Sequence, residues 1–415
     1  MDFDLPPGND PRRLVVRAWL DANPHPTGRQ LAAAGYVAPQ WPPPWGLGAD
    51  PVHRLIIDDE LDRAGVRRPG GIGIGWAAPT LLVAGTPEQQ QRFLPGILSG
   101  EDQWCQLFSE PDAGSDLAGL TTRAARDGDE YVVTGAKIWS SGAHHSRYGI
   151  LLARTDSDAP VATDPAPGSP SRQAGRGLQR KHRGISYFVC PMDLPGITLR
   201  PIVDMTTAHS FNQVFFDGVR LPASLRVGDE GAGWRLAKVT LSNERVMLSS
   251  SGSLWGSGPS AAVLLDLVRA HGGVSDRGLR QRLAMVHCEA EVLRLNRLRT
   301  LSAGLAGRTP GPEASIQKIM ADEHGQHVME LAKDLAGPAG MLEGSGPAGD
   351  VPERARTGPT EVNVKPDHHL PGVDPIWHYG FLFAPALTLG GGTFAIQRNI
   401  VAEMVLGLPR DPRPA

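Results

Sequence analysis

The sequence predicts an α+β protein built from three consecutive parts: an N-terminal α-helical domain over residues 1–103, a middle antiparallel β domain over 104–226 and a C-terminal four-helix-bundle domain over 227–415. Three observations predict this order. Apolar residues follow the helical period near the N-terminus, change to short runs rich in β-branched and aromatic residues after about Trp104, and return to the helical period after about Gly231. The length of 415 residues suits about two to three domains with buried cores.

Composition excludes several classes of protein. The chain carries 41 basic and 44 acidic residues, and the net charge of -3 gives no electrostatic reason to expect a nucleic acid or an anionic membrane as partner. Its 3 cysteines form no C-x-x-C pair, which argues against a disulfide framework and a structural zinc site. The N-terminus is acidic and proline-rich, and no apolar run approaches the roughly 18 residues of a membrane span. We therefore expect a cytoplasmic protein without a metal site.

Local signals identify helices in the first part. Leu14, Val15, Ala18 and Trp19 are spaced to form one apolar face of a helix. Thr86-Pro87-Glu88-Gln89 predicts the start of another, because a threonine N-cap, a proline at the first helical position and a glutamine three residues after the cap form a capping box. This region is predicted to be all helical.

The middle part contains five strand-like runs bounded by Gly, Pro or Asp: YVVTGAKIW, YGILLAR, GISYFVCPM, GITLRPIV and NQVFFDGVRL. Because no helical pattern separates them, they predict an antiparallel sheet or a small barrel. Residues 157–182 interrupt the runs with a Pro/Gly/Ser-rich stretch, which we interpret as an insertion between two strands.

Two long helices are predicted in the last part. Their apolar positions recur every three or four residues and would bury a shared seam, as bundle helices do. The positions are Leu279, Leu283, Val286, Ala290 and Leu293 in the first helix and Ile316, Met320, Val328, Leu331 and Leu335 in the second. A second irregular insertion is predicted from about Glu343 to Pro375.

Two neighbouring motifs carry the functional signal: QLFSEPDAGSD (106–116) and GAKIWSSGAHH (135–145). The hydroxyls of Ser109 and Ser115, with nearby backbone N–H groups, are suited to a polar, ring-shaped or phosphorylated ligand. The indole of Trp139 can pack against a planar ring while the hydroxyl of Ser141 reaches its edge. Composition alone does not name that ligand.

With these motifs, the sequence resembles the acyl-CoA dehydrogenase family of flavoproteins. The resemblance extends over nearly the whole chain and includes FNQVFFDGVRLPASLRVGDEGAGWRLA (211–237) and GGGTFAIQRNIVAEMVLGLPR (390–410). No G-x-G-x-x-G follows a strand, so a Rossmann domain is not indicated. The resemblance implies that FAD lies between the β domain and the C-terminal helices, with the acyl-CoA on the other face of the flavin.

The resemblance also implies roles for individual residues. Gln106, Phe108 and Ser109 would lie along the isoalloxazine ring, and Ser115 would contact either an FAD phosphate or the CoA moiety. Trp139 would stack near the flavin, and Ser141 would hydrogen-bond near N5. Taken singly, these residues have simpler interpretations: Phe108 as a core residue, Ser115 as a turn cap and Trp139 as an aromatic at a domain junction.

The resemblance places the catalytic base on a helix. Many family members carry Glu in a Tyr-Glu-Gly-Thr motif before the last helix, where this chain has Gly390-Gly391-Gly392-Thr393. Long-chain and isovaleryl types instead carry Glu-Arg early in the C-terminal domain, and Glu244-Arg245 stands there. Glu244 is thus the candidate base and Arg245 a candidate substrate contact, while the Gly391 N–H could bind the thioester carbonyl. The alternative for Glu244 is a solvated helix carboxylate. A carboxylate introduced at position 391 is expected to replace it in part.

These assignments imply an FAD-dependent dehydrogenation of an acyl-CoA to the trans-2-enoyl-CoA, with electrons passed to an electron-transferring flavoprotein. A homodimer or homotetramer is expected, and a heteromer stays open. Two alternatives keep the fold: a flavin-dependent oxidase or monooxygenase, and a partner subunit of a heteromeric dehydrogenase.

Overall fold

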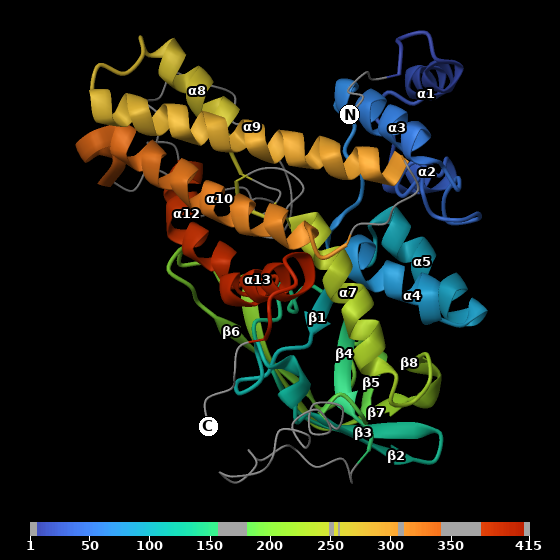
Figure 1. Ribbon diagram of the computed structural model, residues 1–415. Helices are drawn as coiled ribbons and strands as arrows, with labels where there is room; N and C mark the ends of the chain where they lie inside the picture. The colour runs from blue at the N-terminus through green and yellow to red at the C-terminus, as the bar shows by residue number, and fades with distance from the viewer. Residues whose placement is uncertain are drawn as a thin grey trace.

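The structure is a computed structural model in which a helical part, a sheet and a second helical part follow one another along the chain (Figure 1). The predicted order of the three parts is confirmed. The described residues are 6–156, 181–248, 253–255, 258–305, 311–341 and 375–410. Most of the two predicted insertions, residues 157–180 and 342–374, lies outside them, so their interpretation is untested.

The N-terminal part is helical, as expected. Its elements are α1 (Pro11–Ala22), α2 (Gly28–Ala33), α3 (Pro51–Arg63), the π-helical turn η1 (Gly73–Ala77), α4 (Ala78–Ala84) and α5 (Pro87–Ser99). The predicted capping box begins α5: the Gln89 backbone N–H donates to Thr86 Oγ1 at 3.2 Å, and the Thr86 N–H donates to Gln89 Oε1 at 3.1 Å. This start was predictable because both partners lie within one turn.

The predicted apolar face of α1 is wrong. Leu14 and Val15 are exposed, and the buried residues of this helix are Arg13, Val16 and Leu20. A charged side chain therefore occupies the face that packs against the rest of the protein.

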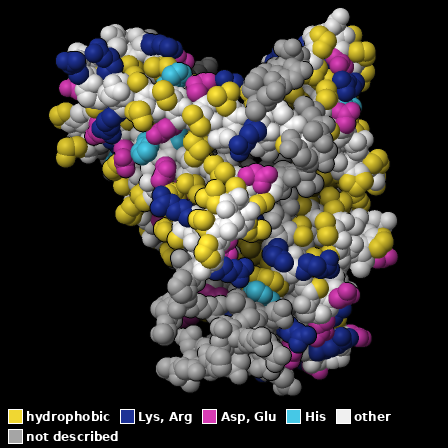
Figure 2. All heavy atoms as spheres, viewed as in Figure 1, with side chains coloured by type: hydrophobic (Ala, Val, Ile, Leu, Met, Phe, Trp, Pro, Cys, Tyr) yellow, Lys and Arg dark blue, Asp and Glu magenta, His cyan; other side chains and the backbone are white. Residues whose placement is uncertain are grey.

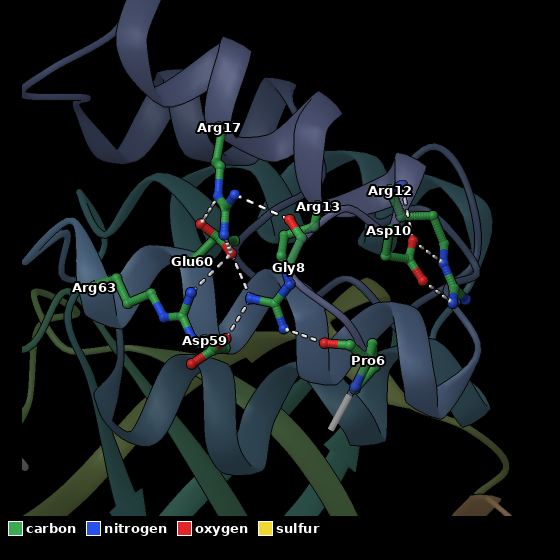
Figure 3. Close-up of polar contacts among 9 residues, drawn as sticks. All are labelled: Pro6, Gly8, Asp10, Arg12, Arg13, Arg17, Asp59, Glu60 and Arg63. Atoms are coloured by element: carbon green, nitrogen blue, oxygen red, sulfur yellow. Dashed lines mark hydrogen bonds and ion pairs between the residues drawn. The ribbon is translucent and has the colours of Figure 1, made fainter. Parts of the chain in front are cut away.

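Carboxylates from α3 explain how Arg13 can be buried. Its guanidinium pairs with Asp59 and with the buried Glu60, while Arg17 Nε donates to Glu60 Oε2 at 2.8 Å and Arg63 approaches Asp59 (Figure 3). A buried charge is tolerated when it is paired and hydrogen-bonded in this way. The network fixes α1 on α3.

The middle part is one sheet of eight strands. They are β1 (Trp104–Leu107), β2 (Arg123–Asp127), β3 (Glu130–Lys137), β4 (Tyr148–Arg154), β5 (Ile185–Pro191), β6 (Ile197–Ile202), β7 (Phe211–Pro222) and β8 (Arg226–Val227), with two 3₁₀ turns, η2 (Leu117–Gly119) and η3 (Ala223–Leu225). The order is β6-β7-β3-β2-β4-β5-β8, and β1 pairs with β4.

The sheet is mixed, which corrects the antiparallel prediction. Most pairs are antiparallel, but β1 runs parallel to β4, and β2 meets β4 in parallel at Arg123 and Arg154. The segment between β1 and β2 leaves β4 after Leu107 and rejoins it at Arg123, and both strands run in the same direction as β4. The prediction assumes that short strands without helices between them are joined by hairpins, which make antiparallel pairs. It therefore misses a crossover connection that makes parallel pairs.

The C-terminal part is helical, and its first helix packs against β5 (Figure 1). It contains α7 (Gly233–Leu248), α8 (Ala261–Ala270), α9 (Arg277–Leu305), α10 (Ala314–Ala336), η4 (Gly337–Met341), α12 (Pro375–Phe383), η5 (Ala384–Thr388), α13 (Phe394–Ile400) and the π-helical turn η6 (Val401–Val405).

The predicted seam between the two long helices is confirmed. Leu283 and Val286 of α9 share a buried cluster with Val328 and Leu331 of α10. The two helices lie side by side (Figure 1), and charged and apolar side chains are interspersed over the viewed face of this helical lobe (Figure 2). Among the described helices, none has the length and apolar character of a membrane span.

Candidate active site

Glu244 lies in the contact between the sheet and the C-terminal helices. This residue of α7 is only 7% exposed, and its Oε2 accepts a hydrogen bond of 3.2 Å from Gln106 Nε2 on β1. Glu244 is thus buried and partnered, unlike the solvated helix carboxylate that was the alternative. The structure brings together two residues that the sequence had assigned to one site.

The surroundings of Glu244 oppose one another in their effect on its ionisation. Burial is the largest effect and raises the pKa of Glu244 above its ordinary 4.5, while the hydrogen bond from Gln106 and the positive charges of Lys318 and Arg245 oppose this only in part. A base works best when its pKa lies near the operating pH, since it must be ionised and still accept a proton. A raised pKa moves this carboxyl toward the pH range in which a general base works.

Arg245 is half-buried, and its side chain bonds to residues of its own helix, α7. Nε donates to the Leu241 carbonyl at 3.3 Å and Nη2 to Ser242 Oγ at 3.3 Å, while burial lowers the pKa of the guanidinium. Its predicted contact with substrate stays a prediction.

The glycine loop before α13 comes close to the same face of α7. Gly391 has a φ of +67°, and a Cβ there would lie 2.5 Å from Leu248 Cδ1 and 3.0 Å from Lys318 Cε. Leu248 lies one turn after Glu244 on α7. The Gly391 carbonyl accepts a hydrogen bond of 2.9 Å from Gln397 Nε2. The Gly391 loop therefore packs against Lys318 and against the turn of α7 that follows Glu244.

Lys318 and Asp322 were missed from the sequence. Both are buried on α10, where Lys318 Nζ donates to Asp322 Oδ2 at 2.5 Å and to the Leu387 carbonyl of η5 at 3.0 Å. The only sequence signal is their spacing of four in a predicted helix, and such pairs are usually solvated. Nothing local shows that this pair faces the interior.

A second buried pair joins the two motifs. Lys137 Nζ, at the end of β3, donates to Glu110 Oε1 at 2.8 Å and to the Phe108 carbonyl at 3.0 Å. Glu110 also accepts from the backbone N–H groups of Thr121 and Thr122. Burial alone would raise the pKa of Glu110, but Lys137 and these donors hold it at about 2. This pair fixes the loop that carries Ser109 and Ser115.

Trp139 is presented on the surface. It is 57% exposed, has a φ of +59° and meets the Phe211 ring edge-to-face at 5.9 Å. The following residue, Ser140, is tied to β7: its N–H donates to the Asn212 carbonyl at 3.0 Å, and the Asn212 N–H donates to its carbonyl at 3.2 Å. The loop is thereby held with the indole facing outward.

The remaining predicted cofactor residues differ in their placement. Phe108 is buried in the main core, so its side chain matches the simpler interpretation of a core residue. Ser109 is half-buried, and its carbonyl accepts from the Ile138 N–H at 2.9 Å. Ser115 and Ser141 are exposed.

These residues fit a flavin. The isoalloxazine is a flat ring system with polar edges, and the exposed indole of Trp139 offers a planar apolar surface beside the exposed hydroxyl of Ser141. Between them, Ser140 Oγ is buried and has no hydrogen-bond partner within the described residues. Such an unpartnered polar atom is suited to a ligand that binds there.

Models of three family domains match the chain in order. They are the acyl-CoA dehydrogenase N-terminal domain over residues 13–101, the middle domain over 105–219 and the C-terminal domain over 231–406. The exact domain limits predicted from the sequence stay predictions.

Two proteins of Mycobacterium tuberculosis illustrate the relationship. The chain is 36% identical to the acyl-CoA dehydrogenase IpdE1 over 96% of its own length and 89% of the relative. It is 38% identical to the acyl-CoA dehydrogenase FadE34 over 92% of its own length, but spans only 46% of that longer protein.

Solved structures agree with this result. The Tcur3481-Tcur3483 steroid ACAD superimposes with a TM-score of 0.71 at 28% identity, covering 99% of this chain and 100% of the other. The ChsE4-ChsE5 complex from Mycobacterium tuberculosis gives a TM-score of 0.71 at 29% identity with the same coverage. The chain belongs to the acyl-CoA dehydrogenase family of oxidoreductases.

Proposed function

We propose that this chain catalyses the FAD-dependent α,β-dehydrogenation of an acyl-CoA thioester to the trans-2-enoyl-CoA, with Glu244 as the base. One observation carries the proposal: the Glu244 carboxylate is buried and held by Gln106 between the sheet and the C-terminal helices, beside the Gly391 loop. A carboxylate that served only solubility would lie on the surface.

The residues divide the work as follows. The Glu244 carboxylate removes the α-proton of the thioester while Gln106 fixes its orientation. The Gly391 N–H donates to the thioester carbonyl oxygen, where negative charge develops as the proton leaves. Trp139 and Ser141 hold the flavin ring, with Ser109 and Ser115 on the adjoining loop. When bound, FAD supplies the acceptor for the hydride that leaves Cβ.

The buried base favours a catalytic chain over a partner subunit that lacks activity. We propose that electrons pass to an electron-transferring flavoprotein in the cytoplasm. We also propose that the chain works in an oligomer, as a homodimer or homotetramer or with a second related chain. The two-chain names of ChsE4-ChsE5 and Tcur3481-Tcur3483 support the last arrangement.

We further propose that the acyl group is bulky, since one structural relative is named a steroid ACAD. Anaerobic titration of the purified, FAD-loaded protein with straight-chain and steroid-derived acyl-CoAs tests the whole proposal. Bleaching of the flavin by a steroid-derived thioester is the expected result. A protein that binds no FAD, or whose flavin none of the thioesters reduces, would overturn the proposal, and rapid reoxidation by oxygen would favour an oxidase.

A further inference from the structure

A lysine of α10 is buried where this helix meets α7 and the Gly391 loop. Lys318 is 0% exposed, and its ammonium group donates to Asp322 Oδ2 and to the Leu387 carbonyl. Burial lowers the pKa of Lys318, whereas the negative charges of Asp322 and Glu244 act in the opposite direction. A buried ammonium is costly without such partners, so its presence here calls for an explanation.

Lys318 lies beside the face of α7 that carries Glu244 and Leu248. A Cβ at Gly391 would lie 3.7 Å from Lys318 Nζ and 2.5 Å from Leu248 Cδ1. Leu248 and Glu244 are four residues apart on α7 and therefore share one face of the helix. The lysine occupies the space toward which a side chain at position 391 would point.

Few charged groups face Glu244 from the described elements around it. Neither η1 nor α4 carries an ionisable side chain. On β5, burial raises the pKa of Tyr187 to about 12 and also raises that of Cys190, so both are neutral near pH 7. On β1, burial raises the pKa of Cys105 to about 12, and Gln106 is an uncharged amide.

Two cations lower the pKa of the carboxylate: Arg245 on its own helix and Lys318, which α10 brings against Leu248 of α7 and the Gly391 loop. Arg245 is directed along α7, where it bonds the Leu241 carbonyl and Ser242. Lys318 is the cation that another element brings to Glu244, with Asp322 as its counter-ion.

We propose that Lys318 is a positioning residue for Glu244: its ammonium group, held by Asp322 and by the Leu387 carbonyl, is the positive charge that α10 places against the face of α7 that carries the buried carboxylate, and it fills the space beside Gly391. This inference rests on the proposed function, because it gives the base its charge state. Lys318 transfers no proton itself. Without the cation, burial would favour the protonated carboxyl, which cannot accept the α-proton.

Lys318→Met tests this, because it keeps the length of the side chain and removes its charge. The matched control is Lys333→Met, which removes a half-buried lysine from the same helix far from Glu244. The measurement is an infrared pH titration of FAD-loaded protein carrying ¹³C-carboxyl glutamate, in which Glu244→Gln identifies the band of Glu244. This readout needs no substrate.

We expect Lys318→Met to raise the titration midpoint of Glu244 by about one pH unit or more, and Lys333→Met to leave it unchanged. An unchanged midpoint in Lys318→Met would overturn the inference. If Lys318→Met leaves Asp322 unpaired and does not fold, the double variant Lys318→Met/Asp322→Asn is compared with Asp322→Asn alone. The Glu244 midpoint of the double variant should lie above that of Asp322→Asn, because the two differ only in the cation, and equal midpoints would overturn the inference.

Flavin reduction followed in the same variants separates this inference from the proposed function. If Glu244 is the base, the pH profile of the flavin reduction rate at saturating acyl-CoA shifts to higher pH by as much as the infrared midpoint does. An infrared shift without a kinetic shift would confirm the effect of Lys318 on Glu244 and contradict the assignment of Glu244 as the base.

Discussion

Gln106 and Glu244 lie 138 positions apart in the sequence, and the amide of the first donates a hydrogen bond of 3.2 Å to the carboxylate of the second. The bond joins β1 of the sheet to α7 of the C-terminal helices. It fixes the carboxylate at the place where these two parts meet, which is where the family resemblance places the flavin.

Removing this bond should weaken the base. Gln106→Met preserves size but takes away a donor that favours the ionised carboxylate, so the kinetic pKa of flavin reduction should rise by about one unit. The reductive half-reaction measured across pH checks this, with Gln103→Met as the control on an exposed neighbouring glutamine. Identical profiles for wild type and Gln106→Met would show that the bond has no influence on the reaction.

The structure leads us to expect that a carboxylate at position 391 does not rescue a missing base, in contrast to the expectation from the sequence. Gly391 has a φ of +67°, which strains any other residue, and a side chain there would force the ends of the Leu248 and Lys318 side chains to move. Gly391→Glu in the Glu244→Gln background should therefore remain inactive and melt at a lower temperature.

Alanine variants at Gly391 and Gly407 separate the cost of backbone strain from the cost of displacing neighbouring side chains. Gly407 has a φ of +68° but open space around it, so Gly407→Ala carries only the backbone cost of roughly 1–2 kcal/mol. Gly391→Ala should cost more than that in chemical denaturation. Equal costs would contradict the predicted displacement of Leu248 and Lys318.

The Glu110–Lys137 pair predicts a particular dependence of stability on acid. The pKa of Glu110 lies at about 2 in the folded protein against an ordinary 4.5, so its contribution is present above about pH 4.5 and is lost as the pH falls toward 2. We expect wild type to lose on the order of 3 kcal/mol more than Glu110→Gln over this range.

Denaturation curves at several acidic pH values provide the measurement. Asp116→Asn is the control, because it removes an exposed carboxylate of the same loop that pairs with Lys181 at the surface. This control should change stability by less than about 1 kcal/mol. Parallel pH curves for wild type and Glu110→Gln would contradict the account of the pair.

Trp139 should matter for FAD and not for folding. Its side chain is 57% exposed, so Trp139→Ala should leave the melting temperature of the apoprotein nearly unchanged while weakening FAD binding about tenfold or more. Fluorescence titration of apoprotein with FAD measures this, beside Val83→Ala as a control on an exposed apolar residue of α4. Equal FAD affinity in wild type and Trp139→Ala would remove the indole from the proposed site.

The features predicted correctly from the sequence are those with local causes. The capping box at Thr86 and Gln89 depends on residues within one turn, and the seam of α9 and α10 depends on helical spacing. The α1 face was missed because Arg13 is buried by a carboxylate from another helix, Glu60. The parallel pairing of β1 with β4 was missed because it depends on the path of the chain between them.

The site was only partly visible for the same reason. Resemblance to a family pointed to Glu244 and Trp139, and the structure adds the contacts that hold them. The Lys318–Asp322 pair resembles a solvated helix pair in sequence, and only the packing of α7 and the glycine loop onto α10 shows that it is buried.

The central claim is that Glu244 removes the α-proton, and stopped-flow measurement of flavin reduction in Glu244→Gln under anaerobic conditions tests it most directly. The amide is nearly isosteric, so FAD content, melting temperature and acyl-CoA binding should match wild type and serve as controls. Our account predicts that the rate of flavin reduction falls by about 100- to 10,000-fold. Reduction at the wild-type rate in a variant that passes these controls would contradict it.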